Sequence, residues 1–79
     1  MWIRPRDQKI VGRSLAEARL SAHITQQQLA RKLRKPQSFV SAYESGQRRV
    51  DVLEFLTIVR AIGVPPGGIF RAVEKATAK

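Results

Sequence analysis

Residues 25–46 read TQQQLARKLRKPQSFVSAYESG, and this stretch contains the start and stop signals of two short helices. Thr25 and Gln28 have the spacing of a capping box, in which each side chain binds the backbone amide of the other residue. The first helix is therefore expected to begin at Gln26.

Pro36 separates the two helices of this stretch. A proline disfavours the α conformation of the residue before it, so the first helix should stop near Leu33. Proline fits the first turn of a helix, where its missing N–H would have had no partner. The second helix is expected from Pro36 or Gln37 to Glu44, with Gly46 just past its end. Two helices joined by a turn this short form the helix-turn-helix pattern.

Helical periodicity continues on both sides of this hairpin. A helix over residues 8–22 is predicted, with Asp7 as its N-cap, because apolar residues recur at helical spacing at Val11, Leu15, Ala18 and Ala22. Asp51 and Glu54 approximate a second capping box, for a helix that Gly63 closes. A weaker last helix is expected over residues 66–76. No stretch shows the alternation of apolar and polar residues that is typical of a strand. The sequence therefore predicts an all-α fold of five helices, with residues 1–79 as a single domain.

Composition narrows the class of protein. With 79 residues and 43% hydrophobic residues, the chain lies in the range of small globular domains. It has no Cys, so disulfides and thiolate metal sites are excluded. The longest apolar runs are far shorter than a membrane span, and residues 1–12 lack the apolar region of a signal peptide. A soluble, cytoplasmic protein with no membrane partner is expected.

The charge is unevenly placed along the chain. Fifteen Lys and Arg stand against six Asp and Glu, which gives a net charge of +9. Residues 1–49 hold eleven basic and three acidic residues, whereas residues 50–79 hold four and three. A basic half joined to a near-neutral half is typical of a polyanion-binding face with a neutral support or oligomerisation face behind it. The alternative is a generic solubilising surface.

Several motifs together resemble a known family. They are the LxxxR from Leu15 to Arg19, the TQxxLA of residues 25–30, the apolar pair Val40 and Tyr43, then Glu44 and Gly46, and finally VLEFLTIVRAIGV at residues 52–64. From about Arg13 to Phe70 the sequence resembles the Cro and CI repressor-like, or XRE-type, helix-turn-helix domain. The resemblance implies a compact five-helix, lambda-repressor-like DNA-binding domain. It also implies a homodimer on a palindromic double-stranded DNA operator.

The resemblance assigns roles to individual residues. Gln37, Ser38 and Ala42 match positions that face base edges, where Gln can bind adenine N6 and N7. Phe39 either touches a thymine methyl or folds back on the preceding helix. The expected contacts to the DNA backbone are Gln26, Ser41, Ser45, Gln47, Arg48, Lys35 and Arg34, and the expected structural ion pair, which ties the recognition helix to the scaffold, is Arg19 with Glu44.

Two positions depart from the family pattern. The family often has Gly at the end of the first helix and in the turn, where the backbone is left-handed, but His23 and Arg34 stand there in this chain. A left-handed conformation costs a non-glycine residue on the order of 1 kcal/mol or more. The turn is therefore expected to be strained or differently shaped.

The sequence is compatible with three kinds of function. A transcription regulator, a repressor or autoregulator, is favoured by the polar start of the second helix and by the basic half. A protein-interaction module of the same fold, such as an antitoxin or antiactivator that binds a partner protein, is the alternative. An enzyme is the weakest, because the chain lacks a catalytic constellation or a phosphate-binding glycine loop, and no cofactor, metal or small-molecule substrate is expected.

Dimerisation follows from size, since one hairpin reads too few base pairs to specify an operator. The near-neutral half has more apolar residues than one thin core should absorb, and the candidates for the dimer interface are Val50, Leu53, Val64, Ile69 and Phe70. Met1, Trp2 and Ile3 form a further apolar group. Trp2 is expected to close the first or last helix against the core.

Overall fold

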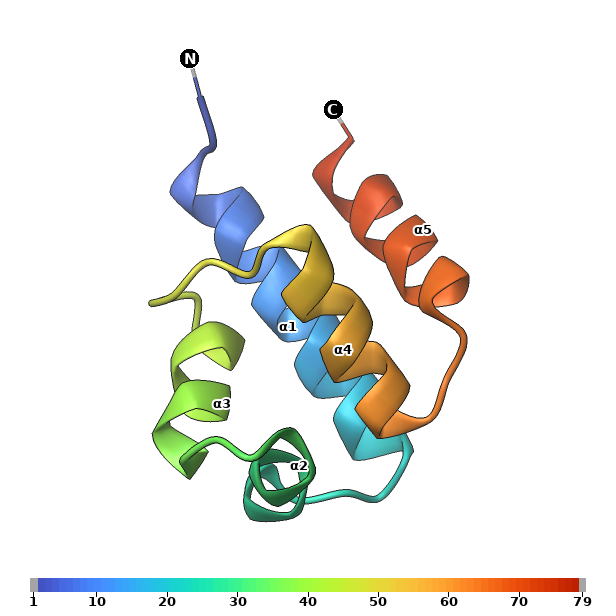
Figure 1. The fold of residues 1–79 in the computed structure, drawn as a ribbon. Coiled ribbons are helices and arrows are strands. Elements are labelled where there is room, and N and C mark those ends of the chain that lie inside the picture. Colours follow the sequence, from blue (N-terminus) through green and yellow to red (C-terminus); the bar gives the residue numbers. More distant parts are fainter. Residues whose placement is uncertain (1, 79) are drawn as a thin grey trace.

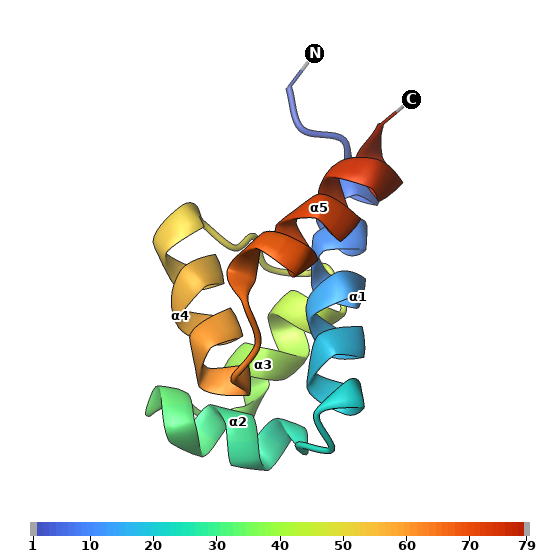
Figure 2. The same cartoon turned by 90° about the vertical axis from the view of Figure 1, so that its right-hand side faces the viewer.

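The computed structural model describes residues 2–78, which form five helices and no strand (Figure 1). The helices are α1 (Pro5–Ser21), α2 (Gln26–Leu33), α3 (Gln37–Glu44), α4 (Val52–Ile62) and α5 (Pro66–Thr77). The all-α prediction is confirmed. Figures 1 and 2 show that α5 runs beside α1, with the N-terminal segment and the end of α5 at the same end of the molecule.

The core is built by the first four helices. Each of them contributes at least one side chain that is almost completely buried, and the largest of these are Leu15, Leu29, Val40, Tyr43, Ile58 and Val59. Helix α5 has no fully buried residue and packs Ile69 against the edge of this cluster. The helix-turn-helix of α2 and α3 is therefore held from behind by α1 and α4.

Both predicted capping boxes are present. The hydroxyl of Thr25 accepts from the backbone amide of Gln28 at 3.0 Å, and the side-chain oxygen of Gln28 accepts from the backbone amide of Thr25 at 2.9 Å. Asp51 and Glu54 make the same pair of bonds, at 2.8 and 3.1 Å. These four bonds satisfy amides that the first turn of a helix leaves free, which is why α2 and α4 begin where the sequence predicts.

The start of α1 differs from the prediction. The helix begins at Pro5 and its N-cap residue is Arg4, so Asp7 is not the N-cap. Instead, Asp7 lies in the first turn and accepts from Nε of Arg4 at 3.0 Å. Proline already has the backbone angle that a helix requires at its first position, and a carboxylate in the first turn is favoured by the helix dipole. These two effects lengthen α1 toward the N-terminus.

His23 and Arg34 both adopt the left-handed conformation, with φ of 59° and 56°. Each is followed by the same hydrogen bond, in which the next amide reaches the carbonyl five residues back, at 3.2 Å for Ile24 and 3.0 Å for Lys35. These are the bonds of a Schellman motif. The two helix ends therefore keep the shape that glycine would give them, at a cost of about 1–2 kcal/mol for each left-handed residue.

Several apolar side chains lie outside the core. The expectation that Trp2 packs against the core is wrong, because its side chain is 80% exposed. Leu53 and Phe70 are 75% and 61% exposed, whereas Val50, Val64 and Ile69 pack partly against the core. The core of so small a domain is already filled by α1 to α4, so these outer residues find no further space in it.

Candidate nucleic-acid interface

Helix α3 presents one polar face to the outside of the molecule. Its inner face buries Val40 and Tyr43, while Ala42 is half-buried at the margin. The exposed positions of the helix are Gln37, Ser38 and Ser41, and Ser45 is exposed directly after its last residue. In Figure 1, α3 lies at the left edge of the fold, and α1 and α4 lie to its right. The residues expected to face DNA are thus gathered on a surface that a large partner can reach.

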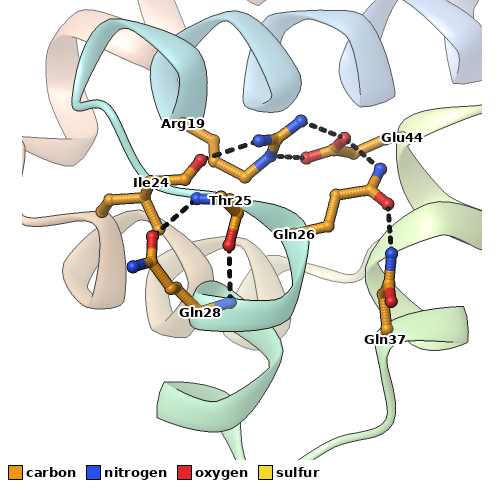
Figure 3. A network of polar contacts seen from close by, with 7 residues as sticks. All are labelled: Arg19, Ile24, Thr25, Gln26, Gln28, Gln37 and Glu44. Carbon is orange, nitrogen blue, oxygen red and sulfur yellow. Dashed lines mark hydrogen bonds and ion pairs between the residues drawn. The ribbon is translucent and has the colours of Figure 1, made fainter.

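A buried ion pair anchors the far end of α3 (Figure 3). Nε and Nη2 of Arg19 bind the two carboxylate oxygens of Glu44 at 2.7 and 3.0 Å, and Nη1 donates to the carbonyl of Ile24 at 2.7 Å. The two side chains are only 9% and 7% exposed. The hydrogen bonds with Glu44 raise the pKa of Arg19 above its usual value, so the guanidinium stays charged. This contact ties α1 to the last residue of α3.

A chain of amides extends this ion pair toward the start of α3. The side-chain nitrogen of Gln26 donates to Glu44 at 2.9 Å, and the Gln26 oxygen accepts from the amide of Gln37 at 3.2 Å (Figure 3). A primary amide has two N–H donors and an acceptor oxygen. Gln37 therefore uses one donor internally and keeps its second donor and its oxygen for an external partner.

Arg48 lies in a second, more open polar cluster. Its guanidinium nitrogens bind the carboxylate oxygens of Glu54 at 3.0 and 2.7 Å, and one of them also donates to the carbonyl of Arg49 at 2.8 Å. The Arg48 hydrogen bond, with the backbone amide of Asp51, lowers the pKa of Glu54 to about 2. The charge of Arg48 is therefore paired within the protein.

Phe39 belongs to the same cluster. Its ring meets Tyr43 edge-on, with 5.5 Å between the ring centroids, and is half-buried against the core. The guanidinium carbon of Arg48 lies 4.7 Å from the Phe39 ring centroid, and the ammonium of Lys35 lies 5.4 Å from it. A cation within about 6 Å of a ring centroid is attracted to the face of the ring, so both cations stabilise Phe39 in this position. Phe39 thus links the turn before α3 to the loop after it.

Other polar residues flank the two ends of α3. Arg34 and Lys35 are exposed before it, and Gln47 and Arg49 are exposed after it. Sequence reasoning missed Gln8, whose amide donates to the carbonyl of Gly46 at 2.6 Å and whose oxygen accepts from Arg49 at 3.2 Å. No pattern in the sequence could have revealed these contacts, because they join residues about forty positions apart. Glu54 was recognised only as a capping residue.

Among residues 2–78, no group of three or more His, Cys, Asp or Glu side chains is arranged to hold a metal ion. Within the same residues, no helix has the length and apolar character needed to span a bilayer.

The helix-turn-helix family HTH_3 matches residues 15–69, which include α2, α3 and α4 entirely. The chain belongs to the XRE-type helix-turn-helix family. A solved structure described as an XRE-family like protein from Pseudomonas syringae pv. tomato is 41% identical to this XRE-type chain. The alignment covers 92% of this chain and 89% of that one, with a TM-score of 0.80.

A second solved structure supports the fold of the XRE-type domain. It is the clp gene regulator ClgR from C. glutamicum, which covers 91% of this chain and 94% of its own, with a TM-score of 0.83. At 19% identity it shows a shared fold alone. No curated protein sequence matches this chain. As a member of the XRE-type family, the protein is a DNA-binding protein.

Proposed function

We propose that this protein regulates transcription by placing α3 in the major groove of a palindromic operator, where it acts as a repressor or autoregulator. The observation that carries the proposal is the hydrogen-bond network that holds α3 in place. The series of side-chain hydrogen bonds from Arg19 through Glu44 and Gln26 to Gln37 fixes both ends of α3 against α1 and α2. A rigid polar helix on the basic half of the chain fits direct readout of a duplex.

Base contacts are proposed for Gln37, Ser38 and Ala42. The free donor and oxygen of Gln37 match the N7 acceptor and N6 donor that adenine presents in the major groove. Ser38 is exposed one residue further along and can donate to or accept from several bases. The small, half-buried side chain of Ala42 lets the helix approach a thymine methyl. Phe39 is proposed to support the helix and not to contact a base, because its ring contacts Tyr43 and Arg48.

Phosphate contacts are proposed at both ends of α3. Each neutralised phosphate adds about 0.9 to the negative slope of log affinity against log salt. Arg34 and Lys35 are exposed cations, so each is expected to contribute fully. Arg48 shares its charge with Glu54 and is expected to contribute less. The remaining proposed contacts are neutral and position the helix: Gln26, Ser41, Ser45 and Gln47.

A homodimer is proposed because two-fold symmetry doubles the sequence that is read. In such dimers the two recognition helices lie about 34 Å apart, in successive major grooves. Val52 and Leu53 on α4 and Phe70 on α5 are 75%, 75% and 61% exposed. These exposed apolar side chains are the proposed contact between two copies of the chain.

The proposal is tested by fluorescence anisotropy with the DNA that flanks the protein's own gene and with a scrambled duplex. We expect a preference of roughly 10³-fold for the native DNA, as specific binders show. Gln37→Ala should reduce this preference, and Lys35→Gln should weaken binding to both duplexes alike. Gln27→Ala is the matched control, because Gln27 is exposed on α2 outside the bonded chain.

Two results would count against this function. Equal losses on both duplexes for Gln37→Ala would refute the base-contact assignment. Failure of the wild-type protein to bind either duplex at low salt would favour a protein-interaction module instead, acting through the exposed apolar residues of α4 and α5.

A further inference from the structure

Helix α1 extends beyond the part of the chain that defines the family. The family match begins at residue 15, whereas α1 begins at Pro5. This additional part of the helix has three exposed basic residues, Arg6, Lys9 and Arg13. They are spaced three and four residues apart, so they lie along one side of the helix. We call these three residues the α1 basic stripe.

The charges of the α1 basic stripe are largely available. Arg6 is 57% exposed, and its nearest approach to a carboxylate is 4.0 Å, to Asp7, which is already bound by Arg4. Lys9 and Arg13 form no ion pair with any residue in the range 2–78. Unlike Arg48, Lys9 and Arg13 are therefore free to meet an external anion, and Arg6 approaches its carboxylate only at 4.0 Å.

The α1 basic stripe borders the loop that follows α3. Gln8 binds the carbonyl of Gly46 and the side chain of Arg49, at 2.6 and 3.2 Å. Lys9 lies so close to Gly46 that a Cβ added to this glycine would collide with its side chain. Figure 1 shows this loop passing beside the N-terminal half of α1. The first turns of α1 and the loop thus form one continuous surface.

We propose that the α1 basic stripe is a second contact surface for the DNA backbone, outside the base pairs that α3 reads. This inference rests on the proposed DNA-binding function. A duplex has an uninterrupted line of phosphates, so a line of free cations next to the α3–α4 loop meets the same polyanion further along. The stripe adds affinity and footprint length without adding base discrimination.

The experiment compares two variants of the full chain that each remove three positive charges. The stripe variant is Arg6→Gln, Lys9→Gln and Arg13→Gln. The control is Arg60→Gln, Arg71→Gln and Lys75→Gln, which changes exposed cations on α4 and α5 that have no ion pair within residues 2–78. Binding is measured against salt on the operator duplex, and on one extended by about one helical turn at each end.

We expect the stripe variant to lower the salt slope by about 2 to 3 per protomer, which is three contacts at about 0.9 each. It should also lose the advantage that the wild-type protein gains from the extended duplex, while its ratio of operator to scrambled affinity stays the same. The control should keep the wild-type slope and the wild-type advantage. Circular dichroism verifies that both variants remain helical, and Lys9→Gln alone should lower the slope by about 0.9.

The outcomes separate this proposal from the function on which it rests. If the wild-type protein discriminates the operator and both variants change the slope equally, only net charge matters and the stripe proposal is overturned. If the stripe variant loses discrimination, the stripe contacts bases and the proposal is again wrong. If the wild-type protein binds no DNA, both the stripe proposal and the proposed function fail.

Discussion

Two Arg–Glu pairs in this protein have nearly the same geometry in different surroundings. Arg19 and Glu44 are joined by bonds of 2.7 and 3.0 Å between α1 and α3, and Arg48 and Glu54 by bonds of 2.7 and 3.0 Å between the α3–α4 loop and α4. The side chains of the first pair are 9% and 7% exposed, and those of the second are 41% and 30% exposed. Bond length alone therefore does not rank their importance.

The surroundings decide what each pair does. Arg19 also binds the carbonyl of Ile24, and Glu44 also accepts from Gln26, so loss of either charge leaves more than one polar group without its partner. Water can replace either member of the pair formed by Arg48 and Glu54. A buried pair is costly to break, whereas an exposed pair contributes little. The fixed anchor of α3 is thus its contact with α1, and the loop after α3 is held more loosely.

The largest effect is expected from Glu44→Ala. This change leaves Arg19 charged and buried without its partner, and should cost about 3–5 kcal/mol of the free energy of unfolding. Urea denaturation measures the loss. The control is the double variant Arg19→Met, Glu44→Leu, which removes both charges and should cost clearly less than Glu44→Ala. Equal losses in the two variants would mean that packing, and not the unpaired charge, explains the cost.

Gly12→Ala tests the same contact between α1 and α3 from the backbone side. A methyl group there would collide with the carbonyl oxygen of Tyr43 and lie 2.9 Å from that of Glu44. We expect a loss of about 1–3 kcal/mol, because the helices must move apart. Gly68→Ala is the matched control, since a Cβ there meets nothing within 4 Å. The control should be neutral or slightly stabilising, and a comparable loss in both would contradict this account.

The smallest effect is expected from Glu54→Gln. Glutamine preserves the capping box of α4, so only the charge opposite Arg48 is removed. The loss in the free energy of unfolding should be less than about one third of the loss from Glu44→Ala. A loss as large as that of the buried pair would show that exposure does not separate the two regions.

The Glu54 pair should also respond to pH. The pKa of Glu54 is lowered to about 2 in the folded protein, so its contribution is fully present above the usual carboxyl pKa of about 4.3. It is lost as the pH falls from there toward 2. The difference in stability between wild type and Glu54→Gln should therefore shrink over this range. Denaturation curves at pH 6 and pH 3 measure it, and a difference that grows in acid would contradict the assignment.

The sequence by itself determined the helices and most of their ends. The capping boxes at Thr25 and Asp51 and the stops at Gly46 and Gly63 act through bonds that span a few residues, so local spacing reveals them. The start of α1 was missed by three residues because proline at the first position and an acid in the first turn favour a helix as strongly as an N-cap does.

The tertiary structure alone decided how α3 is supported. The pairing of Arg48 with Glu54, the contact of Gln8 with Gly46 and the exposure of Trp2 leave no periodic trace in the sequence. The Arg19–Glu44 pair was expected through family resemblance, but its burial and its bonded chain to Gln37 required coordinates. Such contacts depend on which helices cross and how closely, and packing sets that crossing over the whole chain at once.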